Sequence, residues 1–231
     1  MGEASGPAIE VRIGGVALDA ALRLAERAAG LGADRIGVGT PLIYARGMGV
    51  IAEVCARAGG APVLANLTVH DGCFRFLAQS RRHGAEFGTV SAIHNQAGCR
   101  QGVRCRLATG IRVLADMTCM ATADLPGRAR ELEAIGMDGV VVALGHDPAR
   151  YDPGRRESDG VAAVVAAVGI AVGCVVSTRA EAHAAAGQGA DWLVLDGAAF
   201  EAAEGGLAAA MAEIRAGAWP TRPRPQPAAG Y

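Results

Sequence analysis

Apolar residues gather in eight short runs along the chain, and each run is followed by a longer stretch with the apolar spacing of a helix. Four of the runs begin directly after a Gly-x-Asp or Gly-x-Glu turn, at residues 32–34, 84–86, 136–138 and 189–191. These turns are 52, 52 and 53 residues apart, and a fixed period of this size indicates a repeated structural unit. The predicted strands cover residues 9–13, 35–38, 63–67, 87–92, 111–117, 139–144, 170–175 and 192–195.

Eight strand–helix units predict an α/β fold with a single (β/α)8 TIM barrel. The strand runs are almost continuously apolar, which is typical of parallel strands covered on both faces. We expect the barrel to span residues 8–216, between a flexible N-terminal tail at 1–7 and a Pro-rich C-terminal tail at 217–231. In this fold the chemistry lies at the C-terminal ends of the strands, so candidate residues are sought there.

Several polar residues mark where helices should begin. Thr40, followed by a proline, is expected to cap the helix after the second strand. Asp71 is expected to cap the helix after the third strand, and Ser177 with Thr178 the helix after the seventh. Residues 145–159 form the longest predicted strand-to-helix loop, which makes them a candidate lid.

Composition excludes several classes of protein. The chain contains no lysine, so all 22 of its basic side chains are arginine. Schiff-base aldolases and pyridoxal-phosphate enzymes need a lysine amine, and both are therefore excluded. The formal net charge is −1 and no basic stripe is present, so we expect no nucleic-acid or membrane partner. Six cysteines without C-x-x-C spacing, and an N-terminus unlike a signal peptide, predict free thiols and a cytoplasmic location.

Three segments resemble one known family. Residues 38–43 read VGTPLI, residues 113–117 read VLADM and residues 128–138 read RARELEAIGMD. Each is similar to a segment of the 3-hexulose-6-phosphate synthases, which belong with 3-keto-L-gulonate-6-phosphate decarboxylase to the orotidine 5′-monophosphate decarboxylase suprafamily. The resemblance runs from about residue 9 to residue 200 with order and spacing kept. It implies the same barrel, a small-molecule substrate and a homodimer with its sites near the subunit interface, and it admits Mg²⁺ as a cofactor.

The active-site motif of that family is altered here. The family carries D-x-K-x-x-D at the end of the third strand, where this chain has Asn66, Thr68 and, as the one retained acid, Asp71. At the eighth strand the first family glycine is Asp196, and only Gly197 is kept. The family also has an acid at strand one, an acid at strand two, a histidine at strand six and paired glycines at strand seven, and these positions correspond to Gly14, Gly37, Ala143 and Val175-Val176.

These replacements have a chemical meaning. In the family, the lysine and the carboxylates hold the metal and an enediolate made from a phosphosugar. Without them, the charges that stabilise such an intermediate are missing. Valines in place of the phosphate-loop glycines block close approach of an anion to the backbone. We therefore do not expect ordinary hexulose-phosphate synthase activity.

Three residues are candidate catalytic groups. His70 and Asp71 follow the third strand, and a histidine there can act as acid or base near neutral pH. The alternative is that Asp71 only caps a helix beside a solvated histidine. Asp116 ends the fifth strand inside the barrel mouth, where a buried carboxylate must be paired, metal-bound or protonated. Its alternative role is a structural hydrogen bond to Thr118 or Asn66.

Two groups of residues are candidates for substrate binding. Asn66 and Thr68 alternate with apolar neighbours, so they should point into the barrel and could orient a hydroxyl or carbonyl group, with Thr40 beside them. The alternative is neutral filling of a lost charged site. A second group opens the helix after strand seven and could hold an anion, unless its members are only a helix cap and a surface arginine. This group is Ser177, Thr178 and Arg179, together with Gly197 after strand eight.

Other residues are weaker candidates. His94 and His146 follow strands four and six and could reach the mouth from loops. Cys174 could be a nucleophile, but a small buried core residue is the favoured interpretation. No H-x-H or H-E-x-x-H spacing supports a metal site, so the sequence identifies no metal ligands.

Three functional hypotheses follow. We favour a repurposed lyase, decarboxylase or isomerase that acts on a small polar carbonyl compound, with His70, Asp71 and Asp116 as acid–base groups. The second hypothesis is a non-catalytic binding or scaffold barrel. The third, ranked below both, is a true 3-hexulose-6-phosphate synthase with relocated groups. The sequence does not identify the substrate.

Overall fold

The computed structural model describes residues 6–15, 17–93, 96–151 and 154–220. Most of both predicted tails, and the candidate His94 with its neighbour Asn95, lie outside the described residues. Among the described helices, none combines the length and the apolar character that crossing a bilayer requires. All six cysteines are free thiols, as their spacing predicts.

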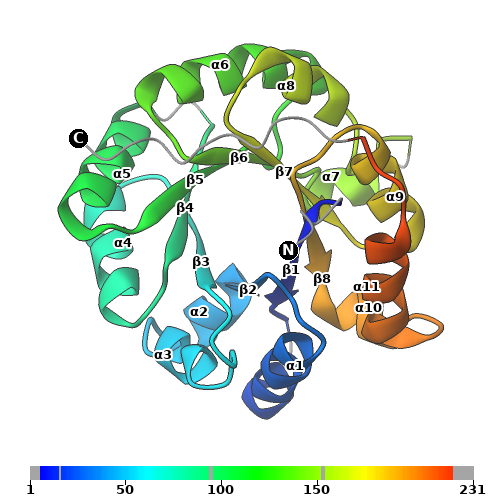
Figure 1. Cartoon of the computed structure of the whole chain (residues 1–231). Coiled ribbons are helices and arrows are strands. Elements are labelled where there is room, and N and C mark those ends of the chain that lie inside the picture. The colour runs from blue at the N-terminus through cyan, green and yellow to red at the C-terminus, as the bar shows by residue number, and fades with distance from the viewer. Residues whose placement is uncertain (1–5, 16, 94–95, 152–153, 221–231) are drawn as a thin grey trace, which may run out of the picture.

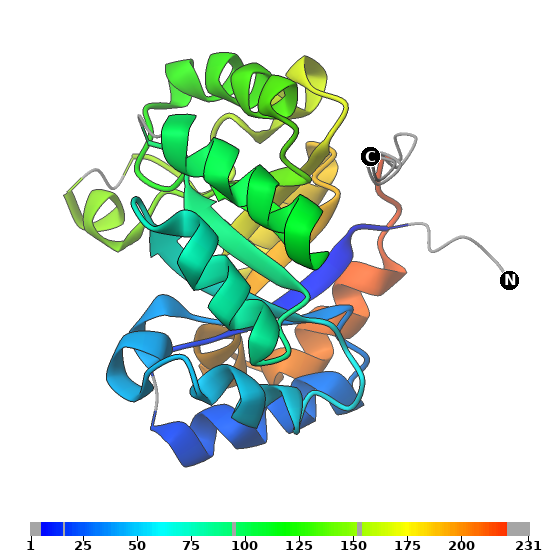
Figure 2. The same cartoon turned by 90° about the vertical axis from the view of Figure 1, so that its left-hand side faces the viewer.

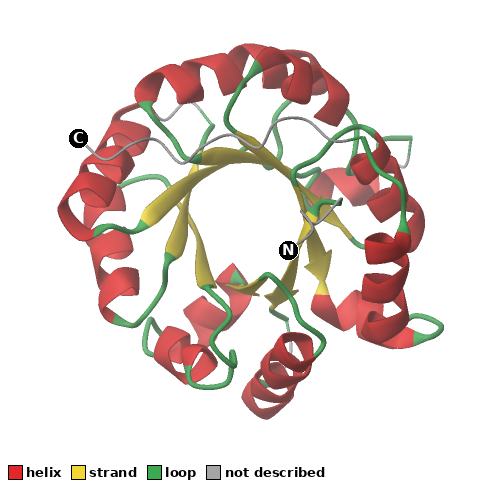
Figure 3. Ribbon diagram, in the orientation of Figure 1, coloured by secondary structure: helices red, strands yellow, loops and turns green. Residues whose placement is uncertain are grey.

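Eight parallel strands close into a barrel in which each strand pairs with its neighbours in sequence and β8 returns to β1. Figures 1 and 3 look along this barrel, with the strands inside and the helices around them. The prediction of a single (β/α)8 TIM barrel is confirmed. The strands are β1 (Ala8–Ile13), β2 (Arg35–Val38), β3 (Val63–Val69), β4 (Phe87–Ser91), β5 (Arg112–Asp116), β6 (Gly139–Val142), β7 (Ala171–Val176) and β8 (Trp192–Asp196).

The helices cover the outside of the barrel, as the side view in Figure 2 shows. The single helix expected at 199–215 is two helices, because Gly205 and Gly206 adopt φ values of 73° and 66° that interrupt it. The predicted loop at 145–159 contains a short helix of its own. The helices are α1 (Leu18–Gly30), α2 (Thr40–Arg46), α3 (Val50–Cys55), α4 (Cys73–Arg82), α5 (Gln96–Thr109), the 3-10 helix η1 (Thr122–Asp124), α6 (Leu125–Ile135), α7 (His146–Tyr151), α8 (Val161–Ala167), α9 (Arg179–Gly187), α10 (Gly197–Ala202) and α11 (Gly206–Ala216).

The recurring turn ties neighbouring strands together where they begin. Its glycines adopt positive φ, which frees the chain to leave a helix and enter a strand. The acid that follows then binds a backbone amide of the preceding strand in three of the four repeats. Asp34 accepts from the Ile9 amide at 2.8 Å, Asp138 from Val113 at 2.7 Å and Asp191 from Val172 at 2.7 Å. The period seen in the sequence therefore has a structural cause.

The lower part of the barrel interior holds a buried charge pair among aromatic rings. Glu10 is 1% exposed and accepts from the Arg35 guanidinium at 3.3 Å. That guanidinium lies 4.0 Å from the centre of the Phe87 ring and 5.3 Å from that of Trp192. Burial lowers the pKa of Arg35, and the adjacent Glu10 partly compensates. The indole fits because Gly173 has no side chain: a Cβ there would lie 2.1 Å from a Trp192 ring carbon.

This packing predicts the effect of adding one methyl group. Gly173→Ala forces the Trp192 indole to shift inside a closed barrel, and such overpacking costs about 1–3 kcal/mol of unfolding free energy. Gly187→Ala at the end of α9 is the matched control, because a Cβ there meets nothing within 4 Å. The control should be neutral or up to about 1 kcal/mol more stable. Urea denaturation followed by circular dichroism measures both, and equal midpoints for the two variants would contradict this account.

Candidate functional site

The C-terminal end of β3 is bulged. Ala65 pairs with Gly88, but the next pairing joins Val69 to Val90, so β3 carries extra residues in between. The hydroxyl of Thr89 on β4 holds this bulge: it donates to the Asn66 side-chain oxygen at 2.9 Å and accepts from the Leu67 amide at 3.0 Å. Asn66 is 5% exposed, so its side chain is fixed and buried at the mouth.

Thr68 lies within the bulge with φ at 47°. A β-branched residue is rarely found in this left-handed region, and the conformation stores roughly 1–3 kcal/mol of strain. The Thr40 hydroxyl donates to the Asn66 carbonyl at 2.8 Å and lies 3.0 Å from the Thr68 hydroxyl. Because a hydroxyl has one proton, Thr68 must be the donor to Thr40. The structure thus brings together the three predicted binding residues Thr40, Asn66 and Thr68.

Two of the predicted helix caps are wrong. Gly39 occupies the N-cap position of α2, and Thr40 is the first helical residue, which directs its hydroxyl toward β3. Gly72, with φ at 67°, occupies the N-cap position of α4, and the Asp71 side chain makes no cap there. His70 and Asp71 are exposed at the rim just past β3. The exposure of these two side chains contrasts with the burial of Asn66 and Asp116.

Asp116 ends β5 and is 5% exposed. One of its carboxylate oxygens accepts from the Thr118 amide at 2.9 Å and from the Thr118 hydroxyl at short range. The structural partner expected for Asp116 is therefore present, while Asn66, the other expected partner, binds Thr89 with its side-chain oxygen. This contact holds the carboxylate in one orientation at the mouth.

Three backbone amides at the start of the helix that follows β7 are bound by side chains. Glu181 accepts from the Ser177 amide at 2.9 Å and from the Thr178 amide at 3.1 Å, and the Thr178 hydroxyl accepts from the Glu181 amide at 3.2 Å. This is a complete capping box, with Thr178 as the N-cap of α9. Arg179 points away, toward an ion pair with Glu213 at 3.2 Å. Among the donors expected to hold an anion, the Ser177 and Thr178 amides are thus bound to the Glu181 carboxylate, and the Arg179 guanidinium to that of Glu213.

The helix that follows β8 shows the same arrangement. Asp196 is the N-cap of α10 and accepts from the Ala198 and Ala199 amides, both at 3.1 Å. Gly197 has a packing reason to be glycine, because a Cβ there would lie 2.9 Å from the Arg12 carbonyl oxygen of β1. Glu181 and Asp196 therefore each hold a carboxylate on backbone amides just past two neighbouring strands, β7 and β8.

The structure adds two charged residues that the sequence reasoning missed. Arg12 alternates with apolar neighbours on β1, a signal that its side chain faces the interior, and its Nε is buried without a hydrogen-bond partner in the described part of the chain. Glu157, from the loop before α8, accepts from the Leu144 amide just past β6 at 2.6 Å. No local pattern predicts that contact, because it depends on how the loop folds back.

Cys174 is a core thiol, in line with the favoured interpretation. It is fully buried, its sulfur donates to the Glu157 carbonyl at 3.4 Å, and burial raises its pKa well above the ordinary thiol value. A thiol in this state is a poor nucleophile at neutral pH.

A magnesium site finds no support in the donor set. Within residues 6–15, 17–93, 96–151 and 154–220, no group of three or more His, Cys, Asp or Glu side chains is arranged to hold a metal ion. The family acids at strands one and two correspond to Gly14 and Gly37, and Asn66 uses its side-chain oxygen for Thr89. The described residues therefore do not fit Mg²⁺.

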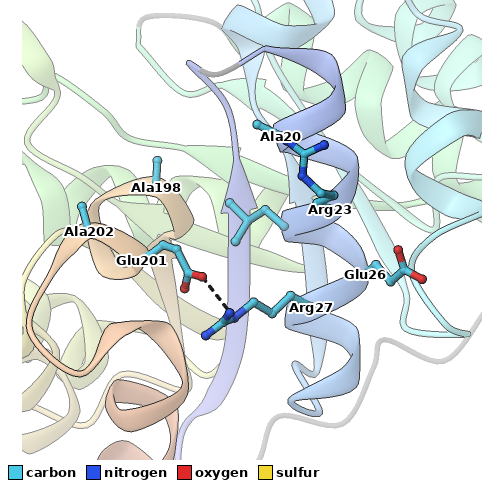
Figure 4. A pocket seen from close by; sticks show the side chains of 8 residues that line it. Ala20, Arg23, Glu26, Arg27, Ala198, Glu201 and Ala202 are labelled. Carbon is cyan, nitrogen blue, oxygen red and sulfur yellow. Dashed lines mark ion pairs between the residues drawn. The ribbon is translucent and has the colours of Figure 1, made fainter.

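A hollow of about 740 Å³ lies outside the barrel, between α1 and α10. Figure 4 shows its lining of alanines and charged side chains, with an ion pair of 3.1 Å between Arg27 and Glu201. A second hollow, of about 490 Å³, lies beside Ser177, Thr178 and Arg179. Neither hollow is lined by Asp116 or Asn66. The polar cluster of the mouth, which consists of Thr40, Asn66, Thr68 and Asp116, is therefore separate from both hollows.

Comparison with known proteins points to one group of enzymes. No protein-family model matches the chain. The 3-hexulose-6-phosphate synthase of Staphylococcus aureus is 27% identical over 114 residues, which are 49% of this chain and 53% of the relative. A 3-hexulose-6-phosphate synthase of Staphylococcus saprophyticus is 29% identical over 114 residues, again 49% of this chain and 53% of the relative. The chain thus matches about half the length of these curated relatives.

Solved structures match over nearly the whole barrel. A 3-hexulose-6-phosphate synthase structure has a TM-score of 0.80 at 28% identity, covering 90% of this chain and 98% of that one. The 3-keto-L-gulonate-6-phosphate decarboxylase of Vibrio cholerae gives 0.75 at 20% identity, covering 93% and 100%, which shows a shared fold. The sequence resemblance and the structural match agree: the chain is similar to 3-hexulose-6-phosphate synthases, and it shares the fold of 3-keto-L-gulonate-6-phosphate decarboxylase and orotidine 5′-monophosphate decarboxylase.

Proposed function

We propose that this chain is a divergent member of the suprafamily, a repurposed lyase, decarboxylase or isomerase that acts on a small polar carbonyl compound without a phosphate group. The observation that carries the proposal is that two carboxylates, Glu181 and Asp196, occupy backbone amides just past β7 and β8. By resemblance, the family admits its substrate's phosphate beside the same two strands.

A phosphate and the two carboxylates would compete for the same backbone donors. Free amides at a helix N-terminus attract anions, and a phosphate would have to displace a carboxylate that is already bound there. It would also be repelled: at a separation of about 4 Å, two like unit charges near a protein surface repel by roughly 4 kcal/mol. Glu181 and Asp196 therefore act against phosphorylated substrates, while a neutral hydroxy carbonyl compound meets no such penalty.

The polar cluster of the mouth supplies the remaining functions. Asp116 would accept or return a proton, since its carboxylate is buried and held in place by Thr118. Asn66 and Thr68 would orient a substrate carbonyl or hydroxyl, with Thr40 fixing both through the bulge of β3. His70 and Asp71 would act from the rim, and in a dimer Asp71 would serve the partner's site.

A non-catalytic binding barrel is the second candidate, and one observation favours it. The Thr118 contacts already give Asp116 a structural role, so its burial alone does not require catalysis. A true synthase is a lesser candidate, supported by the 28% identity to a solved synthase. Against it stands the replacement of the family lysine by Thr68.

The missing charges predict the absence of two activities. Addition of formaldehyde to ribulose 5-phosphate, and decarboxylation of orotidine monophosphate, should both be absent or negligible, because Thr68, Gly14 and Gly37 supply no charge to an anionic intermediate. A coupled assay with purified protein checks both reactions, with a known synthase as positive control. Efficient turnover of either substrate would refute our interpretation of the strand ends.

Asp116→Asn separates a catalytic role from a structural one. If Asp116 is an acid–base group, turnover of the unphosphorylated carbonyl substrate should fall by ~10²-fold or more, with stability unchanged or higher. If it is structural, stability should fall by about 1–3 kcal/mol with little change in ligand affinity. Asp147→Asn, at an exposed position on α7, is the control. The second pattern would favour the non-catalytic barrel.

We also expect a homodimer. Exposed aromatic side chains follow two neighbouring strand ends, with Tyr44 on α2 at 76% and Phe76 on α4 at 43% exposure. Burial of both against a second copy would place Asp71 near the partner's mouth. Light scattering should report twice the 23.4 kDa chain mass at micromolar concentration. A clean monomer would remove the basis for a shared site.

A further inference from the structure

The loop segment around Glu157 is held by side-chain hydrogen bonds at two points. The Glu157 carboxylate accepts from the Leu144 amide, just past the end of β6, at 2.6 Å. Two residues earlier, the Arg155 guanidinium donates to the Met120 carbonyl at 3.3 Å and to the Thr122 hydroxyl at 3.4 Å, in the loop after β5. The loop is therefore tied to the chain just past β6 and to the segment between β5 and η1, which holds the carboxylate at a defined place.

Glu157 and Asp116 are held at the ends of two neighbouring strands: Asp116 ends β5 and pairs with Val141 on β6, and the Glu157 carboxylate binds the amide of Leu144, three residues further along the chain. Both carboxylates lie close enough to Cys119, in the loop after β5, to raise the pKa of its thiol. Burial raises the pKa of Glu157 itself, and the Leu144 amide partly offsets the shift. Five charged or titratable groups from other elements face Glu157: Glu181 on α9, His146 on α7, Arg12 on β1, Cys174 on β7 and Cys119 in the loop after β5.

The two carboxyl groups have different surroundings. Asp116 is bound by two donors of Thr118, whereas Glu157 is half-buried, with one amide donor and the acid Glu181 near it. Two carboxyl groups in unlike environments can divide the work of acid and base, because the desolvated one keeps its proton to higher pH. Proton transfer at a carbonyl compound needs such a division.

We propose that Glu157 is a second acid–base group of the mouth, and that it donates a proton to the substrate carbonyl oxygen while Asp116 removes a proton from the neighbouring carbon. The carbon–hydrogen bond breaks and its electron pair becomes the carbon–carbon double bond of an enediol. The carbonyl π pair takes the Glu157 proton. Asp116 then gives its proton to the former carbonyl carbon while Glu157 takes the hydroxyl proton of the neighbouring carbon, which becomes the new carbonyl; both groups are restored, and the isomerisation consumes no oxidant or reductant. The inference rests on the proposed function and specifies it as hydroxy carbonyl isomerisation.

Exchange of carbon-bound hydrogen in D2O tests this step. Dihydroxyacetone and glyceraldehyde are the probes, and proton NMR follows loss of their signals. The unmodified protein should exchange them faster than buffer, and Glu157→Gln should lower that rate by ~10²-fold or more. Glutamine keeps the size of the side chain and can still accept from Leu144, so stability should hold. Glu53→Gln, exposed on α3, is the control and should leave the rate unchanged.

The pH dependence of the exchange rate distinguishes a catalytic Glu157 from a merely structural one, because a structural residue would not impose its own pKa on the rate. A general acid must be protonated, so the exchange rate should fall as the pH rises through the pKa of Glu157, and this limb should vanish in Glu157→Gln. Carbon-13 NMR of labelled glutamate carboxyls should show one group with a midpoint above the ordinary ~4.3, absent from that variant. A midpoint at or below the ordinary value would overturn the inference without any substrate.

The outcomes separate the two proposals. Loss of exchange in Asp116→Asn but not in Glu157→Gln would overturn the role of Glu157 and leave the proposed function standing. Exchange at the buffer rate by the unmodified protein with both probes would overturn isomerisation and with it this inference. Binding of the same probes, measured by calorimetry and weakened in Asp116→Asn, would in that case still support the proposed function.

Discussion

A hydrogen bond between a carboxylate and a backbone amide is the interaction on which this structure depends. At the lower end of the barrel, Asp34, Asp138 and Asp191 each bind the amide of a preceding strand, so that neighbouring strands start in register. A parallel barrel has no hairpins to set its register, and these ties help to set it for three strand pairs, β1 with β2, β5 with β6 and β7 with β8. Since the ends of the strands carry the mouth, the geometry of the polar cluster follows from them.

Hydrogen bonds between carboxylates and backbone amides also occur at the C-terminal ends of the strands, where they affect ligand binding. Glu181 and Asp196 satisfy the helix amides beside β7 and β8, and Glu157 satisfies the amide past β6. Backbone amides that could bind an incoming anion are thereby used within the protein. The mouth is left with fixed neutral groups around the β3 bulge and a few carboxylates. This combination suits proton transfer on a neutral ligand better than recognition of a phosphate.

Strain and burial are concentrated at that mouth. Thr68 adopts a left-handed conformation within the bulge, and Asp116 is buried at the end of β5. Natural folds tolerate such local cost where surrounding contacts enforce it, here the Thr89 hydroxyl on β4 and Thr40 on α2. In the interior below the mouth, the buried Arg35 and Glu10 pair is packed against the Phe87 ring. The polar residues of the mouth thus lie above this packed layer of the interior.

The sequence by itself determined the barrel, its eight strands, the burial of Asp116 and the Thr178 cap, because periodic apolar runs and capping residues act over a few residues. It misplaced the caps near Thr40 and Asp71, where a glycine took the position instead. Only the tertiary structure decided the β3 bulge and the place of Glu157. Both depend on contacts between distant segments, Thr89 with Asn66 and Glu157 with Leu144, and no local pattern encodes which partner a loop residue reaches.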